Sequence, residues 1–229
     1  MRTISISRRS LLANAAGLAA APSVLAVNGI AHAQAPAAVV VPITTGAPGT
    51  LPSGLTAALT GGGAPVSWQI QEDQSALEGR ALVQTSADRT DYRFPLCIVD
   101  GTSLRDVDIS VHFKPMSGRV DRAAGLVARL RDANNYYVVR ANALENNVNL
   151  YKVEAGRRRE FAGGRAPVAS DRWQLLRLRV QGSQFWVYFE DRQLFEARDT
   201  TFADAGRIAL WTKADSVTAF SQLRYTTPA

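Results

Sequence analysis

The stretch Gly125–Lys152, GLVARLRDANNYYVVRANALENNVNLYK, decides the fold of this chain. Two runs of Val, Leu and Tyr flank the polar turn at 132–135, which predicts an antiparallel hairpin, followed by a loop and a third strand. Because strand side chains alternate, Tyr136, Val138, Arg140 and Asn142 are expected on one face and residues 137, 139 and 141 on the other. The second face is apolar enough for a core. The first face carries the Tyr, Arg and Asn side chains that a polyhydroxylated ligand would require.

Similar short runs, separated by turns, continue along the chain from residue 66 to residue 225, and no segment shows sustained helical periodicity. This pattern predicts an all-β fold, an antiparallel β-sandwich of the jelly-roll type. In the run Trp173–Gln181, the side chains of Leu176, Leu178 and Val180 are expected to point inward. The expected strands are 67–71, 81–85, 96–99, 105–114, 123–131, 136–143, 148–154, 158–162, 173–181, 184–190, 193–198, 206–212 and 217–225.

The N-terminus predicts export. Paired arginines at positions 8 and 9 precede a short alanine-rich apolar run, and Ala31-His32-Ala33 forms a small-x-small cleavage site. This is the pattern of a twin-arginine signal peptide over residues 1–33. A membrane anchor is the alternative, but Asn, Gly and Pro interrupt the run and it would span a bilayer poorly. We therefore expect a periplasmic or secreted bacterial protein, with no membrane insertion after signal cleavage.

Residues 34–65 are expected to form a flexible linker. No charged residue occurs between Arg9 and Glu72, and the segment is built mainly from Ala, Pro, Gly, Thr and Val, including Gly61–Gly63. This composition predicts a tether that is dispensable for folding. The folded domain would then occupy residues 66–229. An edge strand at Val39–Val41 is the alternative.

The charge of the chain and its few cysteine and histidine residues argue against several classes of partner and cofactor. The formal charge of +6 falls to +3 once the signal, with its three arginines and no acids, is removed. The basic run Arg157–Arg159 follows a turn and is interpreted as solvated, so no nucleic acid is expected. Cys97 is the only cysteine and is expected to be buried. The chain lacks a histidine cluster, so no metal and no cofactor are expected, although calcium at the turn 132–135 stays open.

The blocks DANNYYVVRANALENNVNLY (132–151) and GRIALWTKADSVTAF (206–220) resemble the concanavalin A-like jelly-roll domains of the 3-keto-disaccharide hydrolase-like family. The resemblance extends over about residues 66–225. It implies a secreted domain whose partner is a saccharide or a 3-keto-saccharide. Asn146 and Ser221 depart from the pattern, because acids often stand at these two positions, and both losses argue against metal or acid–base chemistry nearby.

One carboxylate is a candidate for catalysis. The chain has no Glu-x-Asp-x-x-Glu spacing, so ordinary retaining glycoside hydrolysis is not expected. Hydrolysis of a 3-keto-glycoside needs only one general base, because the ketone acidifies the neighbouring C2 proton. Glu145 is the candidate catalytic base, and Arg129 and Arg140 are the candidates for stabilising the developing negative charge. The favoured alternative for Glu145 is a loop carboxylate paired with an arginine.

Further substrate-binding candidates lie on the hairpin face and in the turn after residue 210. They are Tyr136, Asn142, Asn147, Trp211, Lys213 and Asp215. A flat indole ring packs well on the apolar face of a sugar. Alternatively, Trp211 fills the end of the core and Lys213 pairs with Asp215. His112 and the other tryptophans are expected to be structural.

Three functions therefore stay open. The first is a carbohydrate-active enzyme of the 3-keto-glycoside hydrolase type, which the family resemblance implies. The second is a non-catalytic saccharide-binding module, and the third is a structural domain of the cell envelope. The missing pair of carboxylates favours the second and the third.

Overall fold

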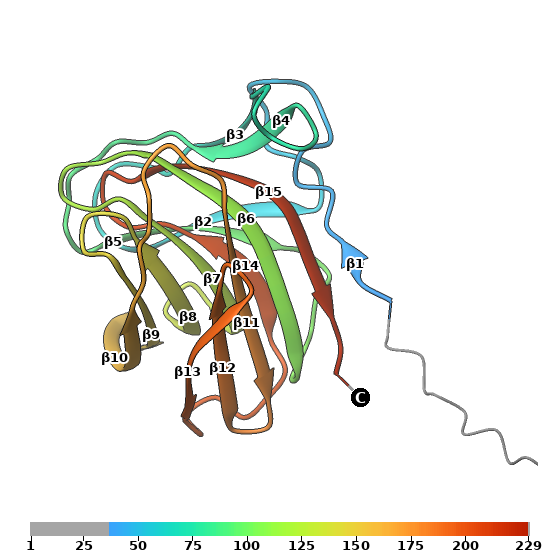
Figure 1. Ribbon diagram of the computed structural model, residues 1–229, viewed down its shortest axis with the longest axis vertical. Helices are drawn as coiled ribbons and strands as arrows, with labels where there is room; N and C mark the ends of the chain where they lie inside the picture. The colour runs from blue at the N-terminus through green and yellow to red at the C-terminus, as the bar shows by residue number, and fades with distance from the viewer. Residues whose placement is uncertain (1–36, 229) are drawn as a thin grey trace, which may run out of the picture. The chain divides into compact units, whose positions relative to one another are not determined.

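The computed structural model describes residues 37–228, so the expected signal peptide and its cleavage site lie outside the described residues. The described chain forms two antiparallel sheets, A and B (Figure 1). Sheet A contains β1 Val39–Val40, β3 Trp68–Glu72, β4 Arg80–Gln84, β6 Val107–Ser117, β11 Gln174–Gln181, β12 Gln184–Phe189, β13 Arg192–Arg198 and β15 Val217–Thr226. Sheet B contains β2 Leu55–Gly61, β5 Arg93–Val99, β7 Ala123–Asp132, β8 Asn135–Asn142, β9 Asn147–Glu154, β10 Arg157–Arg165 and β14 Arg207–Trp211.

The strand order confirms the expected antiparallel sandwich. Sheet A has the order β13-β12-β11-β6-β15-β4-β3, with β1 paired to β15, and sheet B has the order β10-β9-β8-β7-β14-β5-β2. Strands β7 to β10 are consecutive in the chain and form a meander, as the hairpin pattern predicts. All strands expected between residues 66 and 225 are present, with small changes at their ends. Across residues 37–228, no helix is long and apolar enough to cross a membrane.

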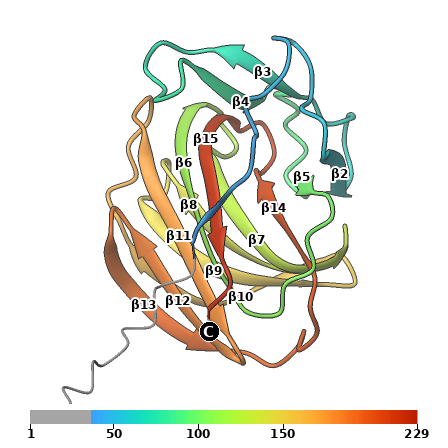
Figure 2. The same ribbon diagram turned by 90° about the vertical axis from the view of Figure 1, so that its right-hand side faces the viewer.

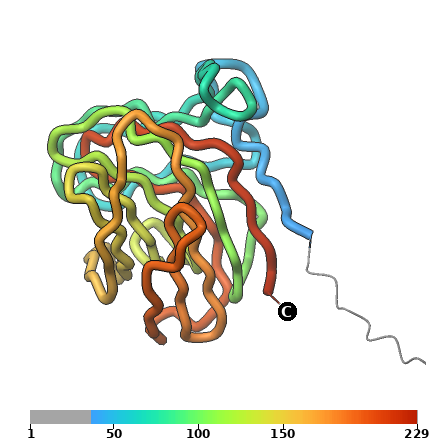
Figure 3. Tube along the Cα trace, viewed as in Figure 1, coloured from blue at the N-terminus to red at the C-terminus, as the bar shows by residue number. Residues whose placement is uncertain are grey.

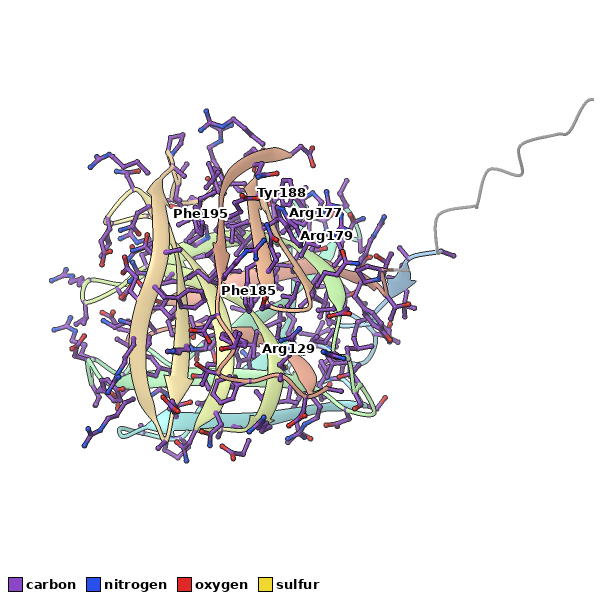
Figure 4. The ribbon with its side chains drawn as sticks, turned by 90° about the horizontal axis from the view of Figure 1, so that it is seen from below. Arg129, Arg177, Arg179, Phe185, Tyr188 and Phe195 are labelled. Atoms are coloured by element: carbon purple, nitrogen blue, oxygen red, sulfur yellow. The ribbon has the colours of Figure 1, made fainter. Side chains whose placement is uncertain are left out.

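The main core lies between the two sheets, which face each other in the view of Figure 2. Strand β11 follows the predicted alternation, because Leu176, Leu178 and Val180 are fully buried in this core. Arg177 and Arg179 point to the outer face of sheet A. Figure 4 shows these two arginines close to Tyr188, and the Arg177 guanidinium lies 4.7 Å from the centre of the Tyr188 ring.

The expectation of a flexible linker is wrong for residues 37–65. Strand β2 pairs with β5 over its whole length, from Leu55 opposite Val99 to Gly61 opposite Arg93. The first strand, β1, lies beside the C-terminal strand β15, as the trace in Figure 3 shows. In the segment that connects β1 to β2, Ile43 is 1% exposed and belongs to the main core. The low charge of this segment therefore reflects burial and edge pairing, and the folded domain begins before residue 66.

Gly61 and the buried Arg93 show why the glycine-rich end of this segment is ordered. Gly61 has a φ of 83°, and a Cβ atom there would overlap the carbonyl oxygen of Tyr92. Glycine is thus required by a close approach of two backbones. The guanidinium of Arg93 donates to the carbonyl oxygens of Ala64 and Pro65 at 3.0 and 3.2 Å, which fixes the chain as it leaves β2.

Replacing Ile43 tests whether residues 37–65 belong to the folded domain. The change Ile43→Ala removes a fully buried side chain, so we expect the free energy of unfolding to fall by about 2–4 kcal/mol. Val40→Ala is the control, because Val40 is 53% exposed and its loss should cost less than about 0.5 kcal/mol. Urea denaturation measures both. Equal, small losses for the two variants would restore the linker interpretation.

Candidate functional site

Sheet B buries side chains on both of its faces. The face toward sheet A contributes residues such as Tyr137 and Val139 to the main core. The opposite face carries a second apolar cluster, which is built entirely from sheet B strands and which we call the outer cluster. Its members are Phe94, Leu96, Ile98, Ala123, Val127, Leu130, Tyr136, Val138, Tyr151, Val153, Ala209 and Trp211.

Arg158 covers aromatic rings of the outer cluster. Its guanidinium lies 4.5 Å from the ring centre of Tyr151 and 4.9 Å from that of Phe94. Two hydrogen bonds hold this cover in place: the Tyr92 hydroxyl donates to the Gly156 carbonyl at 2.7 Å and accepts from the Arg158 amide at 2.7 Å. The interpretation of the basic run as solvated is therefore wrong for Arg158, whose side chain packs on aromatic rings.

The covered position of Tyr136 and Trp211 contradicts the expectation that they contact a sugar. Both side chains are fully buried, and the Trp211 indole donates to the Tyr136 hydroxyl at 3.2 Å. The Trp211 ring also stacks on Phe94 at 5.3 Å. The alternative interpretation of Trp211 as a core residue is confirmed. The alternation that places Tyr136 on the outer face is also correct, but that face is not open to solvent at this position.

The same row of side chains becomes polar toward the end of β8. Here four buried side chains, Asp121, Arg140, Asn142 and Lys213, meet three rim side chains, Asp91, Glu145 and Asn147; we call this group the Asp121 cluster. Asp121 is 1% exposed and lies at its centre. The Asn142 amide donates to Asp121 Oδ1 at 2.8 Å, and Lys213 Nζ lies 3.1 Å from Asp121 Oδ2.

The rim of the Asp121 cluster is held by the two buried cations. Arg140 Nη2 donates to Glu145 Oε2 at 2.6 Å and to Asn147 Oδ1 at 3.0 Å. Lys213 Nζ donates to Asp91 Oδ1 at 2.5 Å. The carboxylates of Glu145 and Asp91 are 48% and 75% exposed, so each reaches solvent while its cationic partner does not. The favoured alternative for Glu145, an arginine-paired loop carboxylate, is confirmed.

Burial and pairing set opposite pKa directions for the two acids next to Arg140. Burial raises the pKa of Asp121, even though Arg140 and Lys213 act to lower it. Burial also acts to raise the pKa of Glu145, but hydrogen bonds from Asn147 and Arg140 hold that pKa below its ordinary value. Glu145 is therefore ionised at neutral pH and is a hydrogen-bond acceptor.

Two of the predicted substrate-binding residues, Arg129 and Asp215, lie outside the Asp121 cluster. Arg129 has a φ of 52° at a register shift between Ala128 and Asp132, and this bulge turns its side chain away from the row of Arg140. Its guanidinium is buried and donates to the carbonyl oxygens of Arg105 at 2.7 Å and Phe202 at 2.8 Å. Figure 4 shows Arg129 apart from the arginines on the outer face of sheet A. Arg129 is thus a structural residue.

Asp215 also has a structural role. Its carboxylate accepts hydrogen bonds from the backbone amides of Arg119 at 2.8 Å and Asp121 at 3.0 Å. It therefore shapes the loop that carries Asp121 and positions the Asp121 cluster without forming part of it. The expected alternative, a pair between Lys213 and Asp215, is not what the structure shows, because Lys213 pairs with Asp91 and Asp121.

Asp121 was missed by the sequence argument, although the signal was present. It stands two positions before Ala123, the first residue of β7, whose side chain is on the outer face. Extending the alternation by one step into the preceding loop places Asp121 on the same face as Arg140. Among the described residues, no group of three or more His, Cys, Asp or Glu side chains is placed to hold a metal ion. At the turn 132–135, Asp132 accepts hydrogen bonds from Asn134 and Asn135, so the turn itself uses these residues.

The comparisons with known proteins agree on the fold. No family model matches the chain. A levanase from Bacillus subtilis (strain 168) is 26% identical over 136 residues, which make up 59% of this chain and 18% of the levanase. The chain thus spans less than a fifth of that curated relative.

Two solved structures overlay on most of the described domain. A family-66 carbohydrate-binding module from Bacillus subtilis matches with a TM-score of 0.58 and 21% identity, covering 76% of this chain and 96% of the module. A β-glucanase from Bacillus licheniformis matches with a TM-score of 0.55 and 13% identity, covering 83% and 98% of the two chains. The fold is therefore that of the concanavalin A-like lectins and glucanases.

Arg140 is 3% exposed, so its removal should destabilise the domain, contrary to the expectation for a solvent-facing residue. Arg140→Ala leaves the buried Asp121 with one cationic partner fewer, and we expect the free energy of unfolding to fall by about 3 kcal/mol. Arg159→Ala removes an exposed arginine on β10 and should change it by less than about 0.5 kcal/mol. Chemical denaturation of both variants is the measurement, and similar values would show that Arg140 is solvated.

Proposed function

We propose that this domain binds a neutral saccharide at the Asp121 cluster. The observation that carries the proposal is the incomplete pairing of its buried centre. Asp121 Oδ2 accepts no hydrogen bond of good geometry, although Lys213 Nζ lies 3.1 Å away, and Arg140 Nε is also buried without a partner. Buried polar atoms in folded proteins are nearly always hydrogen-bonded, so a carboxylate oxygen that is held by ion pairs alone, beside a guanidinium nitrogen without a partner, suggests a ligand that completes the hydrogen bonding.

The chemistry of the cluster fits sugar hydroxyl groups. A hydroxyl both donates and accepts, and the cluster offers carboxylate acceptors beside cationic donors. Arg140 and Lys213 face three carboxylates, those of Asp91, Asp121 and Glu145, so no cation is in excess to attract a phosphate or an acidic sugar. Because Glu145 and Asp91 are the exposed partners, they can turn aside and admit ligand hydroxyls to the two cations.

Binding is favoured over hydrolysis by the state of Glu145. A general base works best when its pKa lies near the operating pH, whereas the pKa of Glu145 is held below its ordinary value. For a 3-keto-glycoside hydrolase, this carboxylate would be a weak proton acceptor. Similarity to a levanase and to a carbohydrate-binding module supports a saccharide ligand, with levan as the first polymer to test.

We also propose that the chain is exported in folded form and cleaved after Ala33. A chain in which both Arg8 and Arg9 are replaced by lysine should not reach the periplasm, because paired arginines define this type of signal. Cell fractionation measures the export, and N-terminal sequencing of the exported chain should begin at Gln34. Accumulation in the membrane of a chain that retains Met1 would contradict this proposal.

Glu145→Gln tests the proposed site. The change keeps the shape of the side chain and removes its negative charge. It thereby weakens the group that accepts hydrogen bonds from Arg140 and, in the proposal, from ligand hydroxyls. We expect about tenfold weaker binding of oligosaccharides derived from levan or β-glucan, measured by calorimetric titration. Glu154→Gln is the matched control, because Glu154 is an exposed carboxylate at the end of β9, and its affinity should equal that of the wild type.

The pH dependence gives an independent check. Because the pKa of Glu145 in the folded domain lies below its ordinary value, the carboxylate is ionised throughout the neutral range. As the pH falls, wild-type affinity should decrease first when Asp121, whose pKa burial raises, takes up a proton, and again when the pH falls through the lowered pKa of Glu145. Release of a product from a 3-keto-disaccharide that Glu145→Gln abolishes would favour the hydrolase instead. Failure of every tested saccharide to bind would overturn the proposal.

A further inference from the structure

A pocket lies on the outer face of sheet A. It has a volume of about 270 Å³ and is lined by Ser75, Leu77, His112, Trp173 and Ser221. His112 on β6 and Ser221 on β15 are direct register partners, so their side chains stand next to each other and form the floor. The connection between β3 and β4 supplies Ser75 and Leu77, and the segment before β11 supplies Trp173. The pocket shares no residue with the Asp121 cluster.

The floor of this pocket contains unpaired polar atoms. Ser221 is 1% exposed, and its Oγ has no hydrogen-bond partner within the described part of the chain; the same holds for Nδ1 of His112. Burial lowers the pKa of His112, so its imidazole is neutral near pH 7. A neutral imidazole offers one donor and one acceptor, and a hydroxyl offers both. The floor is therefore suited to an uncharged ligand that carries hydroxyl groups.

The walls are fixed in place and electrically balanced. The Trp173 indole donates to Ser75 Oγ at 3.0 Å, and Lys114 Nζ donates to the same oxygen at 3.0 Å. Lys114 also forms an ion pair with Asp73 and lies 5.2 Å from the centre of the Trp173 ring. The charge of Lys114 is thus neutralised by a carboxylate. Arg224, which acts on His112, is accompanied by the carboxylates of Glu190 and Asp191. Leu77 is 74% exposed at the rim and adds an apolar surface.

We propose that this pocket binds one neutral sugar unit, which gives the domain a second saccharide site on the sheet opposite the Asp121 cluster. The inference rests on the proposed function for the class of ligand, but on separate residues. The volume lies below the range of about 300–1,000 Å³ that holds drug-sized ligands, so a single ring is the appropriate size. An apolar wall with hydroxyl-matching groups beneath it complements a sugar ring, which has an apolar face and a polar edge.

Two sites on opposite faces change how a polymer is held. The two packed sheets of the sandwich lie between the sites. Two polymer chains, or two distant parts of one chain, can fill both. Binding at the second site then takes place at a high effective concentration, and retention on a polymer exceeds that of either site alone.

Nuclear magnetic resonance titration of the whole folded chain tests the pocket. The probes are short oligosaccharides from levan and from β-glucan. The indole N–H signal of Trp173, identified with Trp173→Phe, reports on the pocket, and the side-chain amide signals of Asn142 and Asn147 report on the Asp121 cluster. We expect both groups of signals to shift in a saturable manner. In Glu145→Gln the titration at the Asn signals should weaken, while the titration at Trp173 keeps its affinity.

Ser221→Ala is the decisive variant, because it removes an unpaired hydroxyl and no hydrogen bond within the protein. Thermal stability should be unchanged, and affinity at Trp173 should fall by about three- to tenfold. Ser110→Ala is the matched control, since Ser110 lies on β6 two residues from His112, outside the pocket lining, and should leave that affinity intact. Absence of a saturable shift at Trp173, or equal affinity there in Ser221→Ala and wild type, would overturn the second site. If only the Asn signals respond, the proposed function stands without the second site. If only Trp173 responds, the proposed function fails at the Asp121 cluster while the pocket is a saccharide site.

Discussion

Arg158 lies across the aromatic rings of Tyr151, Phe94 and Trp211 on the outer face of sheet B. Without this cover, these three rings would present apolar surface to water, and large apolar patches are rare on soluble proteins. The long side chain of arginine can pack its methylene groups and its guanidinium plane on rings while keeping some contact with solvent. The bonds between Tyr92, Gly156 and the Arg158 backbone then bring the start of β5 against the turn between β9 and β10. Sheet B can consequently bury both of its faces.

The position of the Asp121 cluster follows from this cover. Along β8 the outer row starts with Tyr136 and Val138, beneath the apolar cover, and ends with Arg140 and Asn142. The row thus passes from aromatic packing to charge within the buried part of the sheet. A charge that is removed from water is costly unless it is paired, and Asp121 is the group that meets Arg140 and Lys213 there. The rim carboxylates remain exposed to solvent and pair with these buried cations.

Alternation of side chains was sufficient to predict the strands from residue 66 onward and the two faces of the hairpin, because each strand has its own period-2 signal. It was not sufficient for β2. That strand has a single neighbour, β5, and its sequence LTAALTG contains mostly small and polar residues. Edge strands need little apolar surface, so their composition is close to that of a linker. The order of residues 37–65 instead depends on long-range contacts, such as the one that Arg93 makes with Ala64, and no local pattern records them.

The candidate site was predicted in part for the same reason. Five of the predicted residues do meet, because the alternation along β8, the loop after β8 and the turn after β14 bring them together. They are Arg140, Asn142, Glu145, Asn147 and Lys213. Arg129 does not join them, since the bulge at its position reverses the alternation, and a bulge has no clear signature when the residue at positive φ is not a glycine. The burial of Tyr136 and Trp211 was also beyond local reasoning. It results from Arg158, Tyr92 and the curvature of the whole sheet, whereas alternation states only which face a side chain is on.

The two outer faces of the sandwich differ in how their side chains reach solvent. Sheet B buries much of its outer face, and at the Asp121 cluster the exposed side chains are the rim carboxylates of Glu145 and Asp91. Sheet A leaves most of its outer face open, with Arg177 and Arg179 lying on Tyr188 and Trp186. It is covered only where Trp173 and the connection between β3 and β4 pack over β6 and β15, and the neutral pocket forms beneath this cover. One sandwich therefore forms two different surfaces. The charged rim arises on sheet B, where charges are paired at the edge of a buried face. The neutral pocket arises on sheet A, where part of an exposed face is covered.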